Sequence, residues 1–381
     1  MDWVESAEAI GEVDELLASV GLGHGQRKTL AGTWQRGERR AKGKEAQSSS
    51  PVSSTFQRVK SSSSPKEGEG KAAGGIDAVR AAGWERYAWL RHGFSTRVGG
   101  VSAIYGEGSL NLGFTKEDEA AHVVENRRRF LAEMAGGATT RLVTLRQAHS
   151  GMVRVIGPGG VEDGERAGSR IASGLAGLET ADGRAVLSGD GLMTDLPGVM
   201  LGVQVADCVP VLVADVRRRA VAAFHAGWRG TLARIVERGI GRMRLRYGSR
   251  PEDLVAGVGP AIGACCYSVG EEVRHEFDSQ FAYAPELFSE VYDSNPVREK
   301  YPLLFLTARA PGHSNIGPQI HLDLWEANRR QLLCAGVKAK RITVVGECTA
   351  CARMGAGLKY FSHRGESGFA GRMMALVGVA G

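Results

Sequence analysis

The strongest constraint on the fold is a pair of apolar segments joined by a charged turn, VADCVPVLVADVRRRAVAAFHAGWRGTLARI, residues 205–235. The segments on either side of the arginines are almost continuously apolar and rich in valine and alanine, which is typical of buried strands. The run DVRRR between them predicts the turn of a hairpin. Cys208 and His225, 17 residues apart in the sequence, are therefore expected to lie side by side, because a hairpin brings its two ends together.

Strands and helices alternate through the rest of the chain from about residue 76, which predicts an α/β fold. Apolar residues at helical spacing follow the hairpin at 231–247. Asp323 is placed to cap a later helix, and Gly336 to end it. The glycine-rich segment 157–189 is expected to be an insertion loop. The other predicted strands are 198–206, 254–260 and 341–347, and the other predicted helices are 270–281 and 322–336.

The positive net charge belongs to one segment. The whole chain carries a formal charge of +6, whereas residues 27–71 contain 11 Lys or Arg against 4 Asp or Glu. Such a serine-rich, charged segment is typical of a solvated linker, so we expect no nucleic-acid partner. We divide the chain into an N-terminal amphipathic helix at 1–25, a disordered, basic, serine-rich linker at 26–75 and a globular domain at 76–381.

The location of the protein is predicted from two further features. No apolar stretch approaches the roughly 20 residues that a membrane span needs, so no membrane partner is expected. The first 22 residues hold six acidic and no basic residues, which argues against a secretory signal or a transit peptide. We therefore expect a cytoplasmic protein, whose N-terminal helix is a possible docking element for a protein partner.

The six cysteines are expected to be reduced, because disulfides are rare without secretion. Cys348 and Cys351 form a CxxC pair, which is half of a structural zinc site. No other thiol or histidine pair stands at a matching spacing, so we expect no second zinc site there. Cys265 and Cys266 are expected to pack as small hydrophobic residues.

Three reactive side chains stand at the ends of predicted strands. Cys208 and His225 flank the hairpin, and His149 precedes the strand-like run GMVRVI. Two imidazoles, a thiolate and a water would suit a catalytic zinc. However, local zinc signatures place their ligands only a few residues apart, so the residues alone leave both a metal site and a free thiol open. Arg229, in the glycine-flanked turn HAGWRG, is placed to bind an anion at a helix start.

Eight motifs occur in an order that resembles the multicopper polyphenol oxidase, or laccase-domain, family. Its members are mostly described as purine nucleoside phosphorylases or as peptidoglycan editing factors. The resemblance covers roughly residues 90–378. The tail FSHRGESGFAGR departs from the family's usual FSYRRDG-TGR, with His363 and Gly365 at altered positions. The motifs are HGFSTRVGGVSAIYGEGSLNLG, RQAHSGMVRV, GDGLMTDLPG, ADCVPVLVAD, AAFHAGWRGTL, GVGPAIGACCYSVGEEV, DLWEANRRQLL and ECTACA…KYFSHRGESGFAGR.

The resemblance implies an α/β fold consisting of a single layered α-β-β-α sandwich domain, here with a disordered N-terminal extension. It also implies one zinc ion per chain, held by His149, Cys208 and His225. The implied activity is phosphate-dependent cleavage of adenosine, inosine, guanosine and methylthioadenosine, with adenosine deamination as a second reaction. A multicopper site is excluded on composition, since such sites need about ten histidines, largely in H-x-H pairs, and this chain has 9 histidines and no H-x-H.

The leading functional hypothesis is therefore a zinc-dependent purine nucleoside enzyme that uses inorganic phosphate as co-substrate. We predict catalytic roles for Asp207, Cys208 and His225, with Asp207 as an acid/base or an orienting group. We predict that substrate and phosphate contact Arg97, Asn111 and Arg229.

Two alternative functions belong to other classes. In the first, Cys208 is the nucleophile and His225 the base of a metal-free amide hydrolase of the peptidoglycan-editing kind. In the second, the chain is a non-enzymatic module in which zinc is structural and the N-terminal helix recruits a partner. Bound zinc separates the first alternative from the leading hypothesis, and a partner that still binds a Cys208→Ala variant would favour the second.

Overall fold

The computed structural model of the chain describes residues 75–136, 140–163, 170–174, 178–180, 183–291 and 319–381. The predicted N-terminal helix at 1–25 and all but the last residue of the predicted linker at 26–75 lie outside these residues. All of the described residues belong to one compact unit, Glu69–Gly381. Within them, no helix is long and apolar enough to cross a membrane.

The larger of two main sheets contains the predicted hairpin. Its eight strands run in the order β16-β12-β10-β11-β8-β5-β6-β7. β10 and β11 are antiparallel neighbours, and Asp215 at the end of β10 accepts the backbone N–H groups of Arg217 and Arg218 to shape the turn. The bounds are β5 Val153–Gly157, β6 Gly160–Asp163, β7 Arg170–Ser173, β8 Gly191–Thr194, β10 Val209–Asp215, β11 Ala220–Ala226, β12 Leu254–Val258 and β16 Ile342–Val344.

The second main sheet has five strands in the order β1-β2-β19-β9-β4. It joins the two ends of the domain, because the C-terminal strand β19 lies between β2 and β9. Its bounds are β1 Ala78–Val79, β2 Leu90–Ser95, β4 Arg141–Thr144, β9 Val199–Val205 and β19 Met373–Val379.

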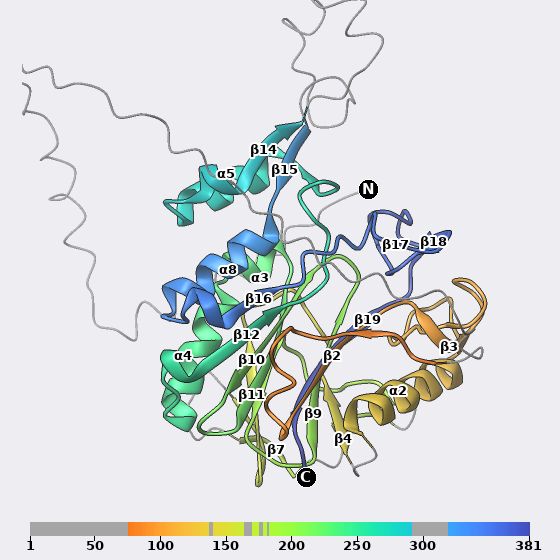
Figure 1. Ribbon diagram of the computed structural model, residues 1–381, viewed down its shortest axis with the longest axis vertical. Helices are drawn as coiled ribbons and strands as arrows, with labels where there is room; N and C mark the ends of the chain where they lie inside the picture. Colours follow the sequence, from red (N-terminus) through yellow and green to blue (C-terminus); the bar gives the residue numbers. More distant parts are fainter. Residues whose placement is uncertain (1–74, 137–139, 164–169, 175–177, 181–182, 292–318) are drawn as a thin grey trace, which may run out of the picture. The chain divides into compact units, whose positions relative to one another are not determined.

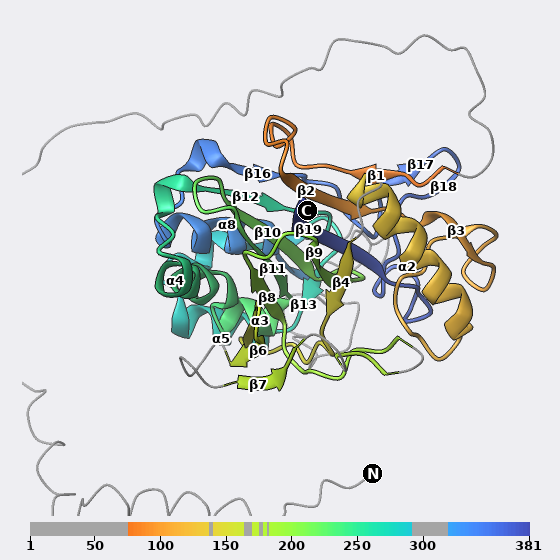
Figure 2. The same ribbon diagram turned by 90° about the horizontal axis from the view of Figure 1, so that it is seen from below.

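The two sheets face each other across an apolar layer. Buried residues from both meet there, among them Phe94 and Val377 from one sheet and Leu212 and Val221 from the other. Both sheets can be this apolar on their inner faces because water is excluded from both. Figures 1 and 2 show the two sheets side by side, with β9 and β19 next to β10 and β11.

Helices cover the outer faces of both sheets. α4 and α8 pack on the eight-stranded sheet, where Ile240 and Leu332 join its core. α2 packs on the five-stranded sheet, where Phe130 and Met134 meet Met374. The order of layers is therefore α-β-β-α, as predicted, and Figure 2 shows α4 and α2 on opposite sides. The bounds are α2 Ala120–Ala135, α3 Trp228–Leu232, α4 Ile235–Tyr247, α5 Glu271–Gln280 and α8 Leu324–Cys334.

Smaller elements complete the described chain. A three-stranded sheet has the order β13-β15-β14, and β17 pairs with β18. The strand β3 follows β2, and short 3-10 helices precede β12, β14 and β16. The bounds are β3 Val98–Ser102, β13 Ser268–Val269, β14 Phe288–Val291, β15 Gln319–Leu322, β17 Arg353–Met354, β18 Gly357–Leu358, η1 Pro251–Asp253, η2 Ala284–Leu287 and η3 Ala339–Arg341.

Most of the predicted elements are confirmed, and the predicted cap is among them. Asp323 accepts the backbone N–H of Glu326 at 2.9 Å at the start of α8. Two predictions are wrong. The helix predicted at 231–247 is broken, because Arg234 adopts a left-handed backbone (φ 54°) between α3 and α4. The segment predicted to be a loop at 157–189 contains β6 and β7, which extend the edge of the large sheet.

Candidate metal centre

The hairpin places Cys208 and His225 together, as predicted. Cys208 directly precedes β10, and the next pair in the register is Val209 opposite Ala226. His225 is the penultimate residue of β11. His149 reaches the same point from the segment between β4 and β5.

One nitrogen of each histidine and the sulfur of the cysteine form a compact group. These ligand atoms of His149, Cys208 and His225 all lie within 4.8 Å of one another. The Cys208 Sγ is 3.8 Å from the His149 Nε2, and the two imidazole rings meet edge to face with their centroids 4.9 Å apart. His225 is buried, Cys208 is half-buried and His149 is exposed. The group therefore opens to solvent on the side of His149.

A buried carboxylate, which the sequence analysis did not single out, holds this group in place. Asp190 is fully buried, and its Oδ1 lies 2.8 Å from the His225 Nδ1. Its two oxygens also accept the backbone N–H groups of Ala148, His149 and Ser150. Asp190 thus fixes both the ring of His225 and the segment that carries His149. The only signal in the sequence is the short motif GDG.

The pKa values of Asp190, Cys208 and His225 depend on one another, because His225 lies between the other two. Burial disfavours the charged thiolate, but the neighbouring imidazoles outweigh it and lower the pKa of Cys208 to about 6. Burial likewise disfavours the imidazolium, but the Cys208 thiolate and Asp190 raise the pKa of His225 to about 9. The pKa of Asp190 falls to about 2, because its hydrogen bonds outweigh its burial. Both shifts favour the form in which Cys208 is a thiolate and His225 an imidazolium.

The backbone around the centre is tightly constrained. His149 and Asp207 both have left-handed φ angles, 56° and 91°, which is unusual for residues other than glycine. Gly227 follows the hairpin, and a Cβ there would lie 2.8 Å from the Cys208 Sγ and 3.2 Å from the His149 ring. Only glycine leaves the space beside the thiol clear. Two nitrogens, one sulfur and an open side fit a zinc ion that keeps one position free.

Asp207 is almost fully buried and holds the C-terminal part of the domain. Its Oδ1 accepts the hydroxyls of Thr349 and Ser362 at 2.6 and 2.7 Å. Its Oδ2 accepts the backbone N–H of Arg364 at 2.6 Å. The carboxylate is therefore engaged by three donors, which suits the orienting role among those predicted for it.

The two predicted phosphate-binding arginines have different surroundings. Arg229 is exposed in α3, and its guanidinium lies 4.3 Å from the Trp228 ring centroid. Within the described part of the chain it has no carboxylate partner. The Arg97 guanidinium is 3.1 Å from the Glu366 carboxylate and also donates to the carbonyl of Tyr105. Arg229 is thus the one available to an anion, and the phosphate role of both stays a prediction.

Asn111 supports the wall of a polar cavity. Asn111 is fully buried, and its Oδ1 accepts the backbone N–H groups of Gly113 and Arg372. Both of those residues line a cavity of about 390 Å³. Its direct contact with substrate stays a prediction.

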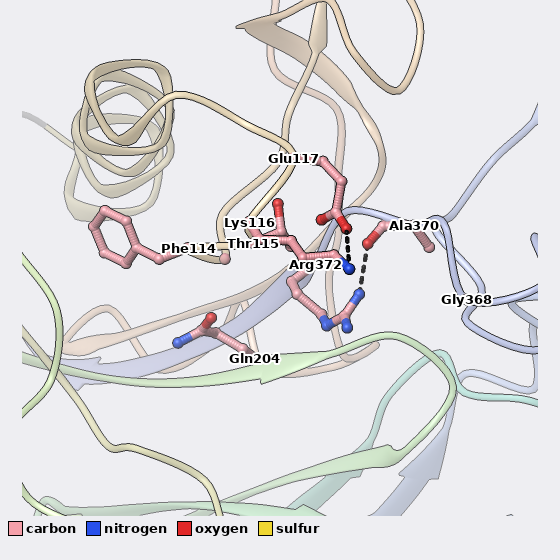
Figure 3. Close-up of a pocket in the computed structure, with 9 residues that line it drawn as sticks. Phe114, Thr115, Lys116, Glu117, Gln204, Gly368, Ala370 and Arg372 are labelled. Carbon is pink, nitrogen blue, oxygen red and sulfur yellow. Dashed lines mark hydrogen bonds and ion pairs between the residues drawn. The ribbon is translucent and has the colours of Figure 1, made fainter.

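The cavity itself is lined by both charged and neutral groups. Figure 3 shows Lys116, Glu117 and Arg372 gathered on one side, with Gln204 below them. Gln204 links the cavity to the metal centre, because its backbone exchanges two hydrogen bonds with the side chain of Gln147, two residues before His149. Lys116 and Arg372, which could bind an anion there, were not predicted from the sequence.

The structure also corrects the expectation for the other cysteines. Cys265 and Cys266 were expected to pack as small hydrophobic residues, but Cys265 is exposed. Both lie beside Cys348 and Cys351, and the four Sγ atoms all lie within 4.8 Å of one another. The premise that the CxxC pair has no partner is therefore wrong, because the partner pair is distant in the sequence and close in space.

Known proteins resemble this chain in both sequence and structure. The family model for multi-copper polyphenol oxidoreductase laccase matches residues 91–380. The purine nucleoside phosphorylase YlmD of Geobacillus stearothermophilus is 34% identical over 303 residues, which cover 77% of this chain and 95% of that protein. Adenosine deaminase RL5, from an unknown prokaryotic organism, is 32% identical over 259 residues, which cover 68% of this chain and 84% of that protein. The crystal structure of YlmD from Geobacillus stearothermophilus superposes with a TM-score of 0.60 at 30% identity, covering 82% of this chain and 98% of that one.

Proposed function

Since the chain belongs to the multi-copper polyphenol oxidoreductase laccase family, we propose that it is a zinc-dependent purine nucleoside enzyme. Its reaction is phosphorolysis of adenosine, inosine or guanosine to the free base and ribose 1-phosphate, and of methylthioadenosine to adenine and methylthioribose 1-phosphate. Deamination of adenosine is a second activity. The observation that carries this proposal is the convergence of His149, Cys208 and His225 in a chain whose relatives are named purine nucleoside phosphorylase and adenosine deaminase.

The donor set favours zinc over the copper of the family's name. Imidazole nitrogen and thiolate sulfur are common zinc ligands, whereas a multicopper centre needs more histidines than the 9 in this chain. When bound here, zinc would supply a Lewis acid with one open position for water or substrate. Residues His149, Cys208 and His225 would hold it.

The chain's own residues prepare the centre for that ion. The Asp190 carboxylate, 2.8 Å from the His225 Nδ1, fixes the ring so that the Nε2 is free to act as a ligand. The lowered pKa of Cys208 keeps its sulfur in the thiolate form that binds metals. The raised pKa of His225 means that its proton must leave when a metal binds. Metal binding should therefore weaken as the pH falls below about 9.

Phosphate and nucleoside have two candidate places near this centre. Arg229, which has no carboxylate partner among the described residues, lies four residues after His225, and its planar guanidinium suits a phosphate. The cavity lined by Lys116 and Arg372 has a volume of about 390 Å³, which is within the range of small-molecule sites. We propose that Arg229 binds the phosphate and that the cavity receives part of the nucleoside.

Product analysis of adenosine tests the proposal. Purified full-length protein is incubated with adenosine, with and without inorganic phosphate, and the products are separated by chromatography. Adenine and ribose 1-phosphate that form only with phosphate would support phosphorolysis, and inosine in both reactions would support deamination. The other three nucleosides are tested in the same way. A zinc-loaded protein that releases neither a free base nor a deaminated product from any of the four would refute the proposal.

A second candidate is favoured by one specific observation. Cys208, His225 and Asp190 are arranged in the order nucleophile, base and orienting carboxylate, and the thiolate–imidazolium pair suits a metal-free cysteine hydrolase. Such an enzyme would cleave an amide of a cell-wall precursor. The two candidates differ in their response to metal, because the hydrolase would keep its activity after zinc is removed and the nucleoside enzyme would lose it.

A further inference from the structure

We propose that Cys265, Cys266, Cys348 and Cys351 form a second metal site, which binds one zinc ion through four thiolates. This site is separate from the centre at His149, Cys208 and His225, and it does not depend on the proposed nucleoside activity. The protein would then bind two zinc ions per chain, instead of the single ion that the family resemblance implies.

Two loops that leave the same edge of the large sheet bring the four thiols together. β12 and β16 are parallel neighbours, with Val258 opposite Val344, and Figure 1 shows them side by side. The pairing continues into both loops, where Ala261 bridges Cys348. The backbone N–H of Thr349 donates to the Ala261 carbonyl at 3.0 Å. The sheet therefore fixes the register in which one cysteine pair meets the other.

The distances within this cluster suit tetrahedral coordination. Zinc–sulfur bonds of about 2.3 Å at a tetrahedral centre place neighbouring sulfurs about 3.8 Å apart. The Sγ atoms of Cys265 and Cys351 are 3.7 Å apart, and all four sulfurs lie within 4.8 Å of one another. The backbone N–H of Gly263 donates to the Cys348 Sγ at 3.3 Å, which would offset part of the charge of a metal-bound thiolate.

The surroundings favour a metal over simple packing. Cys348 is buried, Cys266 is half-buried, and Cys265 and Cys351 are exposed. Burial of apolar surface therefore does not explain why four sulfurs meet at one point. Soft thiolates select zinc among the available divalent ions, and four of them leave no position open for water. The chemistry indicates a structural ion rather than a catalytic one.

The second site would hold the loops that surround Asp207. The carbonyl of Asp207 accepts the backbone N–H of Ile262 at 2.9 Å, and its carboxylate accepts the hydroxyl of Thr349 at 2.6 Å. Ile262 lies three residues before Cys265, and Thr349 lies between the two cysteines of the CxxC pair. A zinc bound here would therefore fix the contacts of the residue that directly precedes Cys208.

Zinc content per chain tests the proposal. Full-length protein is purified in the presence of zinc and a phosphine reductant, desalted and measured by mass spectrometry of the metal. We expect two zinc ions per chain in the unchanged protein, one in Cys351→Ser, one in Cys208→Ala and none in the double variant. Cys334→Ser is the matched control, since Cys334 is an exposed cysteine on α8 outside both clusters, and it should keep two ions. One ion in the unchanged protein, retained in Cys351→Ser, would overturn the proposal.

Thiol alkylation of the unchanged protein gives a second readout that needs no variant to fold. With reductant present, Cys265 and Cys351 should resist alkylation until a zinc chelator is added, whereas Cys334 should react at once. Alkylation of both before chelation would mean that the thiols are free. The same alkylation is repeated without reductant. Alkylation of Cys265 and Cys351 that occurs only with reductant, and without any chelator, would mean that they form disulfides. Either of these results would overturn the proposal.

Discussion

The two cysteine-bearing clusters of this domain differ in ligand type and in the groups that support them. The cluster at His149, Cys208 and His225 is mixed in ligand type and is backed by the fully buried carboxylate of Asp190. The other consists of four thiols that are backed by the N–H of Gly263. Three ligands with one open side are typical of a catalytic zinc, and four thiolates are typical of a structural one.

The two groups of cysteines occupy different positions in the fold. Cys208 lies at the open end of the central hairpin, where rigid strands hold it beside two imidazoles. The four cysteines of the second cluster, Cys265, Cys266, Cys348 and Cys351, lie in two loops that a zinc ion would hold together. Variants of the two clusters should therefore fail in different ways, one in turnover and the other in stability.

The largest effect is expected for Cys208→Ala. This variant removes one of three predicted zinc ligands, so phosphate-dependent cleavage of adenosine should fall below detection. The folded structure should persist, since alanine fits a half-buried site. Cys351→Ser should instead lower the melting temperature and leave measurable turnover at temperatures where the protein stays folded. Equal turnover in Cys208→Ala and the unchanged protein would show that Cys208 is not needed for the reaction.

The next effect is expected for Arg229→Ala. Loss of one charged hydrogen-bond pair to a bound anion costs about 1.5–3 kcal/mol, or roughly 10- to 150-fold in affinity. The KM for phosphate should rise by that factor, while deamination of adenosine should change little. Arg217→Ala, an exposed arginine in the hairpin turn at the other end of β10, is the matched control. Loss of deamination with intact phosphorolysis would place Arg229 at the base end of the site and the phosphate at Arg97.

A smaller effect is expected for Asp190→Asn. Carboxylates that orient a histidine ligand are typically worth about 10- to 100-fold in metal affinity or activity. Zinc affinity should fall by that factor when measured by competition with a coloured chelator. Asp195→Asn is the control, because Asp195 is exposed just after β8. Unchanged affinity in Asp190→Asn would mean that the carboxylate serves only the backbone of residues 148–150.

The smallest effect is expected for deletion of residues 35–75. The sequence of this segment is rich in serine, lysine and glycine and is too polar to form a core. Nucleoside turnover should stay within a few-fold of that of the full chain. Complete loss of turnover in a folded truncation would show that the segment contributes to the active site.

The sequence predicted the parts of the molecule that depend on local patterns. The apolar runs around DVRRR predicted the hairpin, and that hairpin places Cys208 beside His225. Asp323 predicted its cap, because a capping side chain acts within three residues. The motifs that resemble the family predicted the layers, which pattern alone leaves open.

The parts that were missed depend on long-range contacts. Asp190 acts on His225, 35 residues away, and nothing in the motif GDG identifies that partner. Cys265 contacts Cys351, which is 86 residues away in the sequence, because β12 and β16 are parallel neighbours. The spacing of residues in the sequence does not reveal which strands are neighbours in a sheet. The break at Arg234 is a local feature, but the sequence does not reveal it. The apolar residues keep their helical spacing on both sides of Arg234, although the backbone changes direction there.

We propose that the cluster at His149, Cys208 and His225 carries out the reaction and that the four-thiol cluster stabilises the fold. Stepwise removal of zinc with a chelator separates these two roles, when nucleoside turnover, zinc content and melting temperature are followed in the same samples. We predict that turnover falls to zero with the loss of the first ion, from the open centre, and that the melting temperature falls mainly with the second. Turnover that survives the loss of both ions, or that is lost only with the ion bound by the four thiols, would show that the centre at Cys208 does not carry out the reaction.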